Sequence, residues 1–164
     1  MIRIGFSTSR AWYSRLIRAV TKSRCSHTFL VVDLLGVPMV LEEGAFGYLP
    51  SRRLADVPAD ELVGLYVPKA PQVQLEEAVR ASLSEVGQMY GYLVLLGMAV
   101  VYSGRWLGHK WRNPLASPHS NICSERGCKV LQAAGEPGVS SMDPSATSPE
   151  DLLRLYCVDH AERV

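Results

Sequence analysis

The chain has 164 residues, of which 48% are hydrophobic and 20% are charged, and its formal net charge is +1. This length allows one domain with a substantial core, and the composition is typical of a globular protein rather than a disordered one. The small net charge gives no reason to expect nucleic acid as a partner. We therefore predict a single domain over residues 1–164.

Basic residues are concentrated near the start of the chain. Residues 1–32 contain no Asp or Glu. The basic residues of this segment are Arg3, Arg10, Arg15, Arg18, Lys22 and Arg24. Two interpretations stay open: contact with an anionic surface through Arg10, Arg15, Arg18 and Lys22, or a solvated helix face balanced by acidic residues elsewhere in the fold.

No targeting or membrane-spanning segment is expected. The first ten residues, "MIRIGFSTSR", lack an apolar run of signal-peptide length, so we expect the protein to be cytoplasmic as synthesised. Cell lysis or delivery in a virion would then be its routes to the outside. The most apolar stretch, residues 92–102, is shorter than the roughly 20 residues that span a bilayer as a helix.

The first half of the chain favours strands around one helix. Residues 1–8 predict a strand, and residues 9–24 predict an amphipathic helix with Trp12, Leu16 and Val20 facing inward. Residues 27–35 and 37–43 predict a hairpin around Leu35-Gly36. The proline-bearing residues 49–61 predict a loop, and residues 62–69 a further strand.

The second half favours helices. Residues 71–87 have helical spacing, and residues 92–102 predict a buried helix. Residues 103–120 predict a loop that covers another part of the fold. After residue 135 we expect a loop, a helical turn at 149–155 and a short strand at 156–158. Together these elements predict an α+β fold in which an antiparallel sheet packs against helices.

The stretch "NICSERGCKVLQAAG", residues 121–135, predicts a helix that Asn121 caps and Gly135 ends. Cys123 then lies in the first turn, where free backbone N–H groups and the helix dipole lower the pKa of a thiol. Its own N–H could stabilise an oxyanion. Cys123 shares the inward face with Gly127, Val130, Leu131 and Ala134, so structural packing of a buried thiol stays open as an alternative.

A nucleophilic thiol needs a base and a group that orients the base. His27 opens a predicted strand, and the next strand offers Glu42 and Glu43. If the hairpin loop has two or four residues, Glu42 lies diagonally beside His27, whereas an odd loop selects Glu43. Because two-residue loops are the commonest, we predict a Cys123–His27–Glu42 triad with Glu43 as the fallback.

Two other arrangements use the remaining histidines. His119 lies four residues before Cys123 and is a second candidate base. His109, His119, Cys123 and Cys128 have the side-chain types of a zinc site, although their spacing matches no common zinc motif. We expect no metal and no cofactor. The four cysteines are too sparse for a disulfide scaffold, so free thiols are expected.

Five segments resemble, in this order along the chain, a known family. They are "SRCSHTFLVVD", "VPMVLEEG", "YGYL", "NICSERGCKVLQAAG" and "SPEDLLRL". Together they resemble the circularly permuted branch of the NlpC-like papain-fold hydrolases, the YiiX-like proteins. The resemblance runs from about Ser9 to Leu155. It implies a papain-like fold in which the base and its carboxylate precede the nucleophile.

The resemblance also implies roles for residues. Ser26-His27 matches the family's base, Glu42 its orienting carboxylate, and Cys123-Ser124-Glu125 its nucleophile signature. Tyr90 matches a tyrosine near the active site, but Gly91 stands where the family often has Asp.

For activity, the resemblance implies hydrolysis of an amide through a thioester, with a bacterial cell-wall peptide as the leading substrate. A lipid-directed acyltransferase or esterase of the same fold is the alternative, because the basic residues 10–22 and the apolar residues 92–102 would suit a membrane surface. A non-catalytic binding module that keeps the fold is a second alternative.

Overall fold

The computed structural model describes residues 1–9, 12–44, 47–83, 89–90, 92–116 and 120–158. Its strands are β1 (Arg3–Ser7), β2 (His27–Leu34), β3 (Val37–Gly44), β4 (Gly47–Arg53), β5 (Leu62–Tyr66), β6 (Met89–Tyr90) and β7 (Ser120–Asn121). Its helices are α1 (Trp12–Thr21), α2 (Gln72–Leu83), α3 (Tyr92–Trp106), α4 (Cys123–Ala133) and α5 (Pro149–Val158), with short 3-10 helices η1 (Leu54–Asp56) and η2 (Pro144–Ala146).

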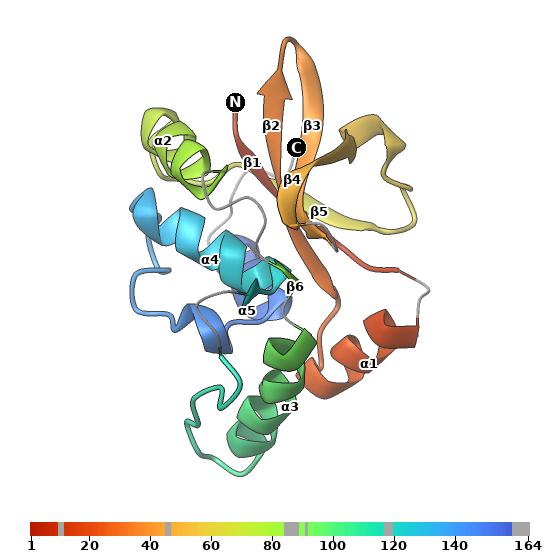
Figure 1. Ribbon diagram of the computed structural model, residues 1–164, viewed down its shortest axis with the longest axis vertical. Coiled ribbons are helices and arrows are strands. Elements are labelled where there is room, and N and C mark those ends of the chain that lie inside the picture. Colours follow the sequence, from red (N-terminus) through yellow and green to blue (C-terminus); the bar gives the residue numbers. More distant parts are fainter. Residues whose placement is uncertain (10–11, 45–46, 84–88, 91, 117–119, 159–164) are drawn as a thin grey trace.

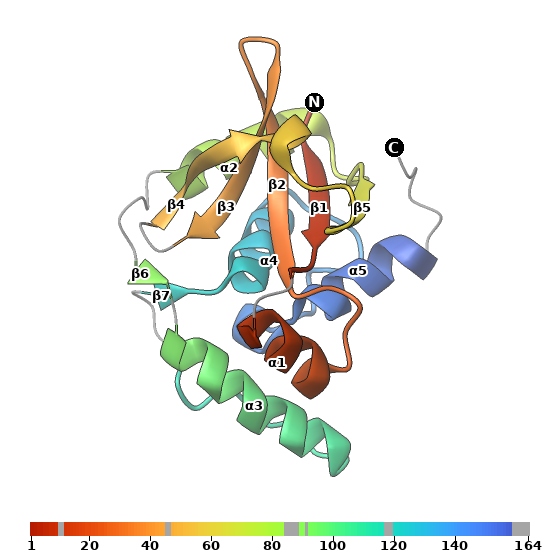
Figure 2. The same cartoon turned by 90° about the vertical axis from the view of Figure 1, so that its right-hand side faces the viewer.

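The main sheet has five strands in the order β4-β3-β2-β1-β5, and each neighbouring pair is antiparallel. Helices α2, α4 and α5 lie on one side of it, whereas α1 and α3 lie side by side at one end of the molecule (Figures 1 and 2). This arrangement confirms the predicted α+β fold with an antiparallel sheet packed against helices.

Both faces of the sheet are buried, because strand side chains alternate between them. The larger core lies between the sheet and the helices, and its members include Ile4, Phe6, Leu30, Leu41, Leu75, Leu131, Leu152 and Leu153. A smaller core on the other face contains Phe29, Val31, Val40, Val57 and Leu65. Strands β1 and β2 are interior strands of the sheet, and together they contribute side chains to its cores on both faces.

The β2–β3 hairpin has the predicted two-residue turn. Leu34 pairs with Val37 and Leu30 pairs with Leu41. Leu35 and Gly36 both have positive φ, 54° and 82°, as this tight turn requires. The hairpin register that the sequence predicts is therefore confirmed.

The loop predicted over residues 49–61 is wrong in its first part. Strand β4 pairs with β3 there and forms the edge of the sheet. Pro50 is tolerated because an edge strand leaves one side unpaired, and the register shifts at its partner, between Val40 and Leu41. This strand brings Ser51 and Arg52 next to β3.

Two helices differ from their predictions. Helix α3 continues to Trp106, and it is not fully buried: Leu93 and Leu96 are exposed. Helix α5 continues to Val158, so the strand predicted at 156–158 is wrong; Tyr156 follows Leu152 and Leu153 at helical spacing and is buried with them. The predicted inward positions of Trp12 and Leu16, and the end of the helix predicted to residue 87, lie outside what the structure describes.

Candidate active site

Helix α4 begins at Cys123 itself. The residue before it, Ile122, is extended at φ −104° and ψ 161° and makes no side-chain cap. Asn121 is therefore not the cap that the sequence predicts, because it is held in β7 by pairing with Tyr90. Arg126 makes the first bond of the helix, from its N–H to the Ile122 carbonyl at 3.0 Å. The N–H groups of the first turn thus have no intrahelical acceptor and can stabilise negative charge at Cys123.

A close approach between α4 and β2 places the thiol against the strand. A Cβ atom on Gly127 would lie 3.3 Å from the Thr28 side chain, so glycine lets the helix and the strand approach closely. The predicted inward face of α4 is confirmed, and Cys123 is only 7% exposed. Its sulfur accepts hydrogen bonds from the backbone N–H groups of Thr28 and Ser124. The helix start and the strand therefore stabilise the same sulfur atom.

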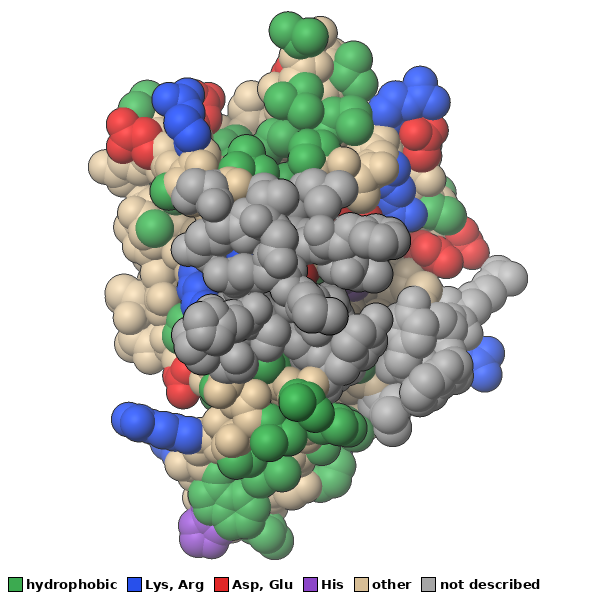
Figure 3. Space-filling model, in the orientation of Figure 1, with side chains coloured by type: hydrophobic (Ala, Val, Ile, Leu, Met, Phe, Trp, Pro, Cys, Tyr) green, Lys and Arg blue, Asp and Glu red, His purple; other side chains and the backbone are tan. Residues whose placement is uncertain are grey.

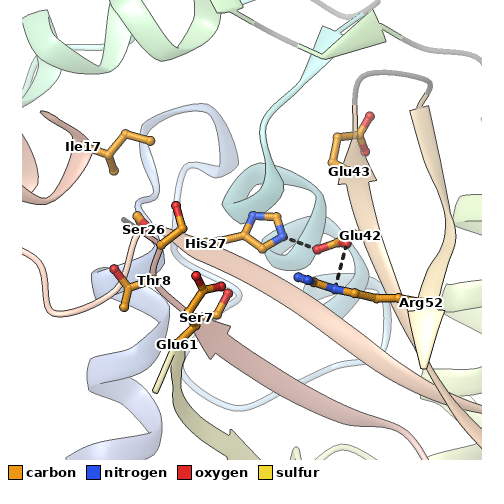
Figure 4. Close-up of a pocket in the computed structure, with 10 residues that line it drawn as sticks. Ser7, Thr8, Ile17, Ser26, His27, Glu42, Glu43, Arg52 and Glu61 are labelled. Atoms are coloured by element: carbon orange, nitrogen blue, oxygen red, sulfur yellow. Dashed lines mark hydrogen bonds and ion pairs between the residues drawn. The ribbon is translucent and has the colours of Figure 1, made fainter. Parts of the chain in front are cut away.

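His27, the first residue of β2, lies between two of the predicted partners. Its Nε2 atom is 2.7 Å from Glu42 Oε2, and its ring is also hydrogen-bonded to Cys123. Figure 4 shows the His27 ring directed at Glu42, with the carboxylate of Glu43 turned elsewhere. The ring stacks beside Phe29 at a centroid distance of 6.3 Å. The structure thus brings together Cys123, His27 and Glu42.

The fallback carboxylate, Glu43, has a different partner. Its Oε2 atom is 3.3 Å from Nε of Arg126 on α4, and these side chains are 0% and 2% exposed. Adjacent residues of a strand point to opposite faces, so Glu42 and Glu43 cannot both face His27. Glu43 instead links β3 to α4 through a buried ion pair.

Glu42 is held by residues that the sequence did not indicate. Ser51 donates its hydroxyl to Glu42 Oε1, and Arg52 Nε lies 3.6 Å from the same oxygen (Figure 4 shows the Arg52 contact). Both residues lie on β4. Because β4 was predicted as a loop, no pattern placed them near the site.

These contacts change the pKa values of the three side chains. Burial lowers the pKa of His27, but the charge and hydrogen bond of Cys123 and those of Glu42 outweigh it and raise the pKa to about 10. Burial raises the pKa of Cys123, but the charge and hydrogen bond of His27 outweigh it, so that pKa is lowered. Burial opposes the ionisation of Glu42 as well, yet His27, Ser51 and Arg52 lower its pKa to about 2.

The lowered pKa of Cys123 and the raised pKa of His27 therefore favour a thiolate–imidazolium pair next to the Glu42 carboxylate. The pKa values of the other two buried thiols are shifted in the opposite direction. Burial raises the pKa of Cys25 to about 12 and that of Cys128 to about 11. All four cysteines are free, as predicted, but only Cys123 combines burial with a lowered pKa among them.

A cavity of about 270 Å³ lies beside His27 and Glu42. One of its walls is fixed by a 2.6 Å hydrogen bond between the hydroxyls of Ser14 and Ser26. It is lined by Ser7, Thr8, Ser9, Ile17, Ser26, His27, Glu42, Glu43, Arg52 and Glu61. All of these residues except Ile17 have polar side chains, which can form hydrogen bonds with groups such as amides.

The other candidates do not come together in the described structure. The side chain of Tyr90 and the whole of His119 and Arg10 lie outside the described residues. His109 is exposed and stacks on Trp111 at 6.0 Å, whereas Cys128 is buried in α4. Within the described ranges, no three His, Cys, Asp or Glu side chains are arranged to hold a metal ion.

Comparison with known proteins finds similarity among solved structures only. No family model matches the chain, and no curated protein matches it. The structure is similar to the crystal structure of the metalloprotein YiiX (DUF1105) from Escherichia coli O157:H7, with a TM-score of 0.53 and 21% identity. The match covers 99% of this chain and 86% of that chain. The YiiX-like fold that the sequence predicts is thus confirmed at the level of the fold.

Proposed function

We propose that this protein is a cysteine hydrolase of the permuted, papain-like NlpC type, which cleaves an amide bond through a thioester. The observation that carries the proposal is the position of the His27 ring, hydrogen-bonded to the Cys123 thiol and 2.7 Å from Glu42. A nucleophile, a base in contact with it and a group that orients the base are the three parts that nucleophilic catalysis requires.

The proposed reaction has two steps. The Cys123 thiolate attacks the carbonyl carbon, and the carbon–nitrogen bond breaks as the imidazolium of His27 gives its proton to the leaving amine. A water molecule then attacks the thioester, His27 accepts a proton from it, and the carbon–sulfur bond breaks to release the acid and restore the thiolate. Glu42 keeps the His27 ring oriented and favours its charged form throughout.

The oxyanion formed in each step needs hydrogen-bond donors. The N–H of Cys123 lies at the start of α4 and has no intrahelical acceptor, so we assign it this role. Tyr90 is proposed as a further substrate or oxyanion contact, because its backbone pairs with Asn121, two residues before the nucleophile.

The leading substrate is a peptide amide derived from the bacterial cell wall, as the family resemblance implies. A lipid ester is the second candidate, favoured by the exposed apolar side chains of α3, such as Leu93 and Leu96, since the inner side of this helix packs on Ile122, the residue before Cys123. A third candidate, a binding module without catalysis, predicts that Cys123 has ordinary thiol reactivity.

The similar protein YiiX is a metalloprotein, which raises the question of a metal at this site. Cys, His and Glu are all metal-ligand types. However, one side of the His27 ring is bonded to Glu42 and the other to Cys123, and the described residues offer no group of three ligands. The side chains do not fit a metal, and no step of the proposed reaction involves one.

The test is peptide release from purified cell-wall sacculi, followed by mass spectrometry. The proposal predicts release by the wild type, none by Cys123→Ala, and near wild-type release by Cys128→Ala, which removes another buried thiol from the same helix. Equal release by the wild type and Cys123→Ala would contradict it. If the wild type cleaves lipid esters but releases no peptide from sacculi, the substrate is a lipid ester and the proposed role of Cys123 still holds.

A further inference from the structure

Helix α3 and residues 107–115 after it expose an unusual amount of apolar surface. Seven of the twelve large apolar side chains that are exposed in the described residues lie here. They are Leu93 at 65%, Leu96 at 62%, Val100 at 40%, Trp106 at 55%, Leu107 at 68%, Trp111 at 44% and Leu115 at 41%. We call these seven residues the α3 surface. Figure 3 shows apolar side chains gathered at this end of the molecule.

The α3 surface is held in place by packing. Asn113 is buried and donates a hydrogen bond to the carbonyl of Val94 at 2.9 Å, which fixes the loop along the helix. A Cβ atom on Gly97 would lie 1.8 Å from Asn113 Oδ1, and one on Gly104 would lie 2.6 Å from the Trp111 ring. The loop thus packs against the side of α3 that carries Gly97 and Gly104, and the seven apolar side chains of the α3 surface remain exposed to solvent.

The two chain segments around this surface carry only basic charged residues, although Arg105 of α3 is paired with Asp151 of α5 at 2.9 Å. No Asp or Glu occurs between Glu85 and Glu125, nor within residues 1–32, and α1 and α3 from these two segments lie side by side (Figure 2). The exposed cations here include Arg15, Lys22, Arg105, Lys110 and Arg112. Lys22 lies over the Trp106 ring, with Nζ 5.2 Å from its centroid.

Exposed leucines and tryptophans beside lysines and arginines are typical of proteins that lie on anionic membranes. None of the described helices is long and apolar enough to cross a bilayer. A second copy of this chain is a poorer occupant, because a two-fold interface would bring the same cations together.

We propose that the α3 surface docks on an anionic lipid bilayer. Leu93, Leu96 and Val100 would enter the boundary between headgroups and acyl chains, with Lys110 and Arg112 at the headgroups. The docking concerns binding alone and does not depend on the proposed chemistry of Cys123.

The docking would also bring the candidate site close to the membrane. The inner side of α3 packs on Ile122, the residue before Cys123, through Val94, Met98 and Tyr102. The start of α4, with Cys123, therefore lies behind α3 as seen from its exposed side. A docked molecule would meet amphiphilic substrates, such as acylated or lipid-linked amides.

The test is flotation of the purified full chain with vesicles of phosphatidylcholine alone or mixed with phosphatidylglycerol. We expect binding to the mixed vesicles that weakens with salt, and little binding to the neutral ones. Leu96→Glu should lower the partition coefficient about tenfold or more, since it removes one buried leucine and adds a repelled charge. Val73→Glu is the matched control, because Val73 is 67% exposed on α2, away from α3 (Figure 1).

A second variant keeps the apolar side chains and removes charge. Lys110→Gln with Arg112→Gln should lower the binding to mixed vesicles and reduce its salt dependence. Cys123→Ala should bind like the wild type, which separates docking from catalysis. The proposal is overturned if the wild type does not float at low salt, if Leu96→Glu and Val73→Glu bind equally, or if the α3 surface instead forms a dimer that ignores vesicles.

Discussion

Replacement of Glu42 by glutamine is expected to lower the pKa of His27 while leaving the ring in place. The structure holds the pKa of Glu42 at about 2, against an ordinary value of 4.5, and its side chain is only 15% exposed. Since one pKa unit corresponds to about 1.4 kcal/mol, the fold favours the ionised carboxylate by about 3 kcal/mol, shared among His27, Ser51 and Arg52. The share of His27 acts equally on the imidazolium. Its pKa should therefore fall from about 10 by about 1–3 pKa units.

The assay is an NMR titration of the imidazole signals. The chain has four histidines, so His27 can be assigned by comparison with a His27→Gln variant. Glu61→Gln is the matched control, because Glu61 lines the same cavity while Glu42 makes the direct bond to His27. A His27 pKa that is unchanged in Glu42→Gln, or that falls equally in Glu61→Gln, would refute the assigned role of Glu42.

Three further predictions concern the surroundings of the site. Glu43→Ala removes the buried ion pair with Arg126 and should lower the free energy of unfolding by about 3–5 kcal/mol in urea denaturation; a loss below about 1 kcal/mol would contradict this. Gly127→Val adds a side chain against Thr28, so it should lower the free energy of unfolding by about 1–3 kcal/mol and slow the alkylation of Cys123. Wild-type values of both quantities would contradict the close approach of α4 and β2. Because folding lowers the pKa of Glu42, its ionisation stabilises the fold above about pH 4.5 and this contribution is lost as the pH falls towards 2. The difference in unfolding free energy between the wild type and Glu42→Gln should become smaller as the pH falls from 4.5 towards 2. A difference that does not change with pH would show that the ionisation of Glu42 does not stabilise the fold.

The hairpin shows how much of the site could be predicted from the sequence. A two-residue turn at Leu35-Gly36 fixes the register of two strands, and the register fixes which glutamate lies diagonal to His27. The contact between His27 and Glu42 follows from local rules alone. The position of Cys123 in the first turn of a helix was predicted as well, although the cap assigned to Asn121 was wrong.

Other features depend on tertiary context. Pro50 disfavours a strand locally, and only its place at the sheet edge, opposite a register shift, makes β4 compatible with it. The contacts of Ser51 and Arg52 with Glu42 could not be predicted either, because both residues lie on β4. Helix α3 has an almost uninterrupted apolar sequence, so no polar face indicated that Leu93 and Leu96 would be exposed.

The measurement that tests the central claim most directly is the alkylation rate of each cysteine against pH, resolved by mass spectrometry, in the wild type and in His27→Ala. The exposed Cys157 serves as an internal reference, and the buried Cys25 and Cys128 report on accessibility. If Cys123 and His27 form a thiolate–imidazolium pair, Cys123 reacts fastest near neutral pH and loses that advantage in His27→Ala. If Cys123 reacts as slowly as Cys25 and Cys128 in both proteins, the pair does not exist and the proposed hydrolase is wrong.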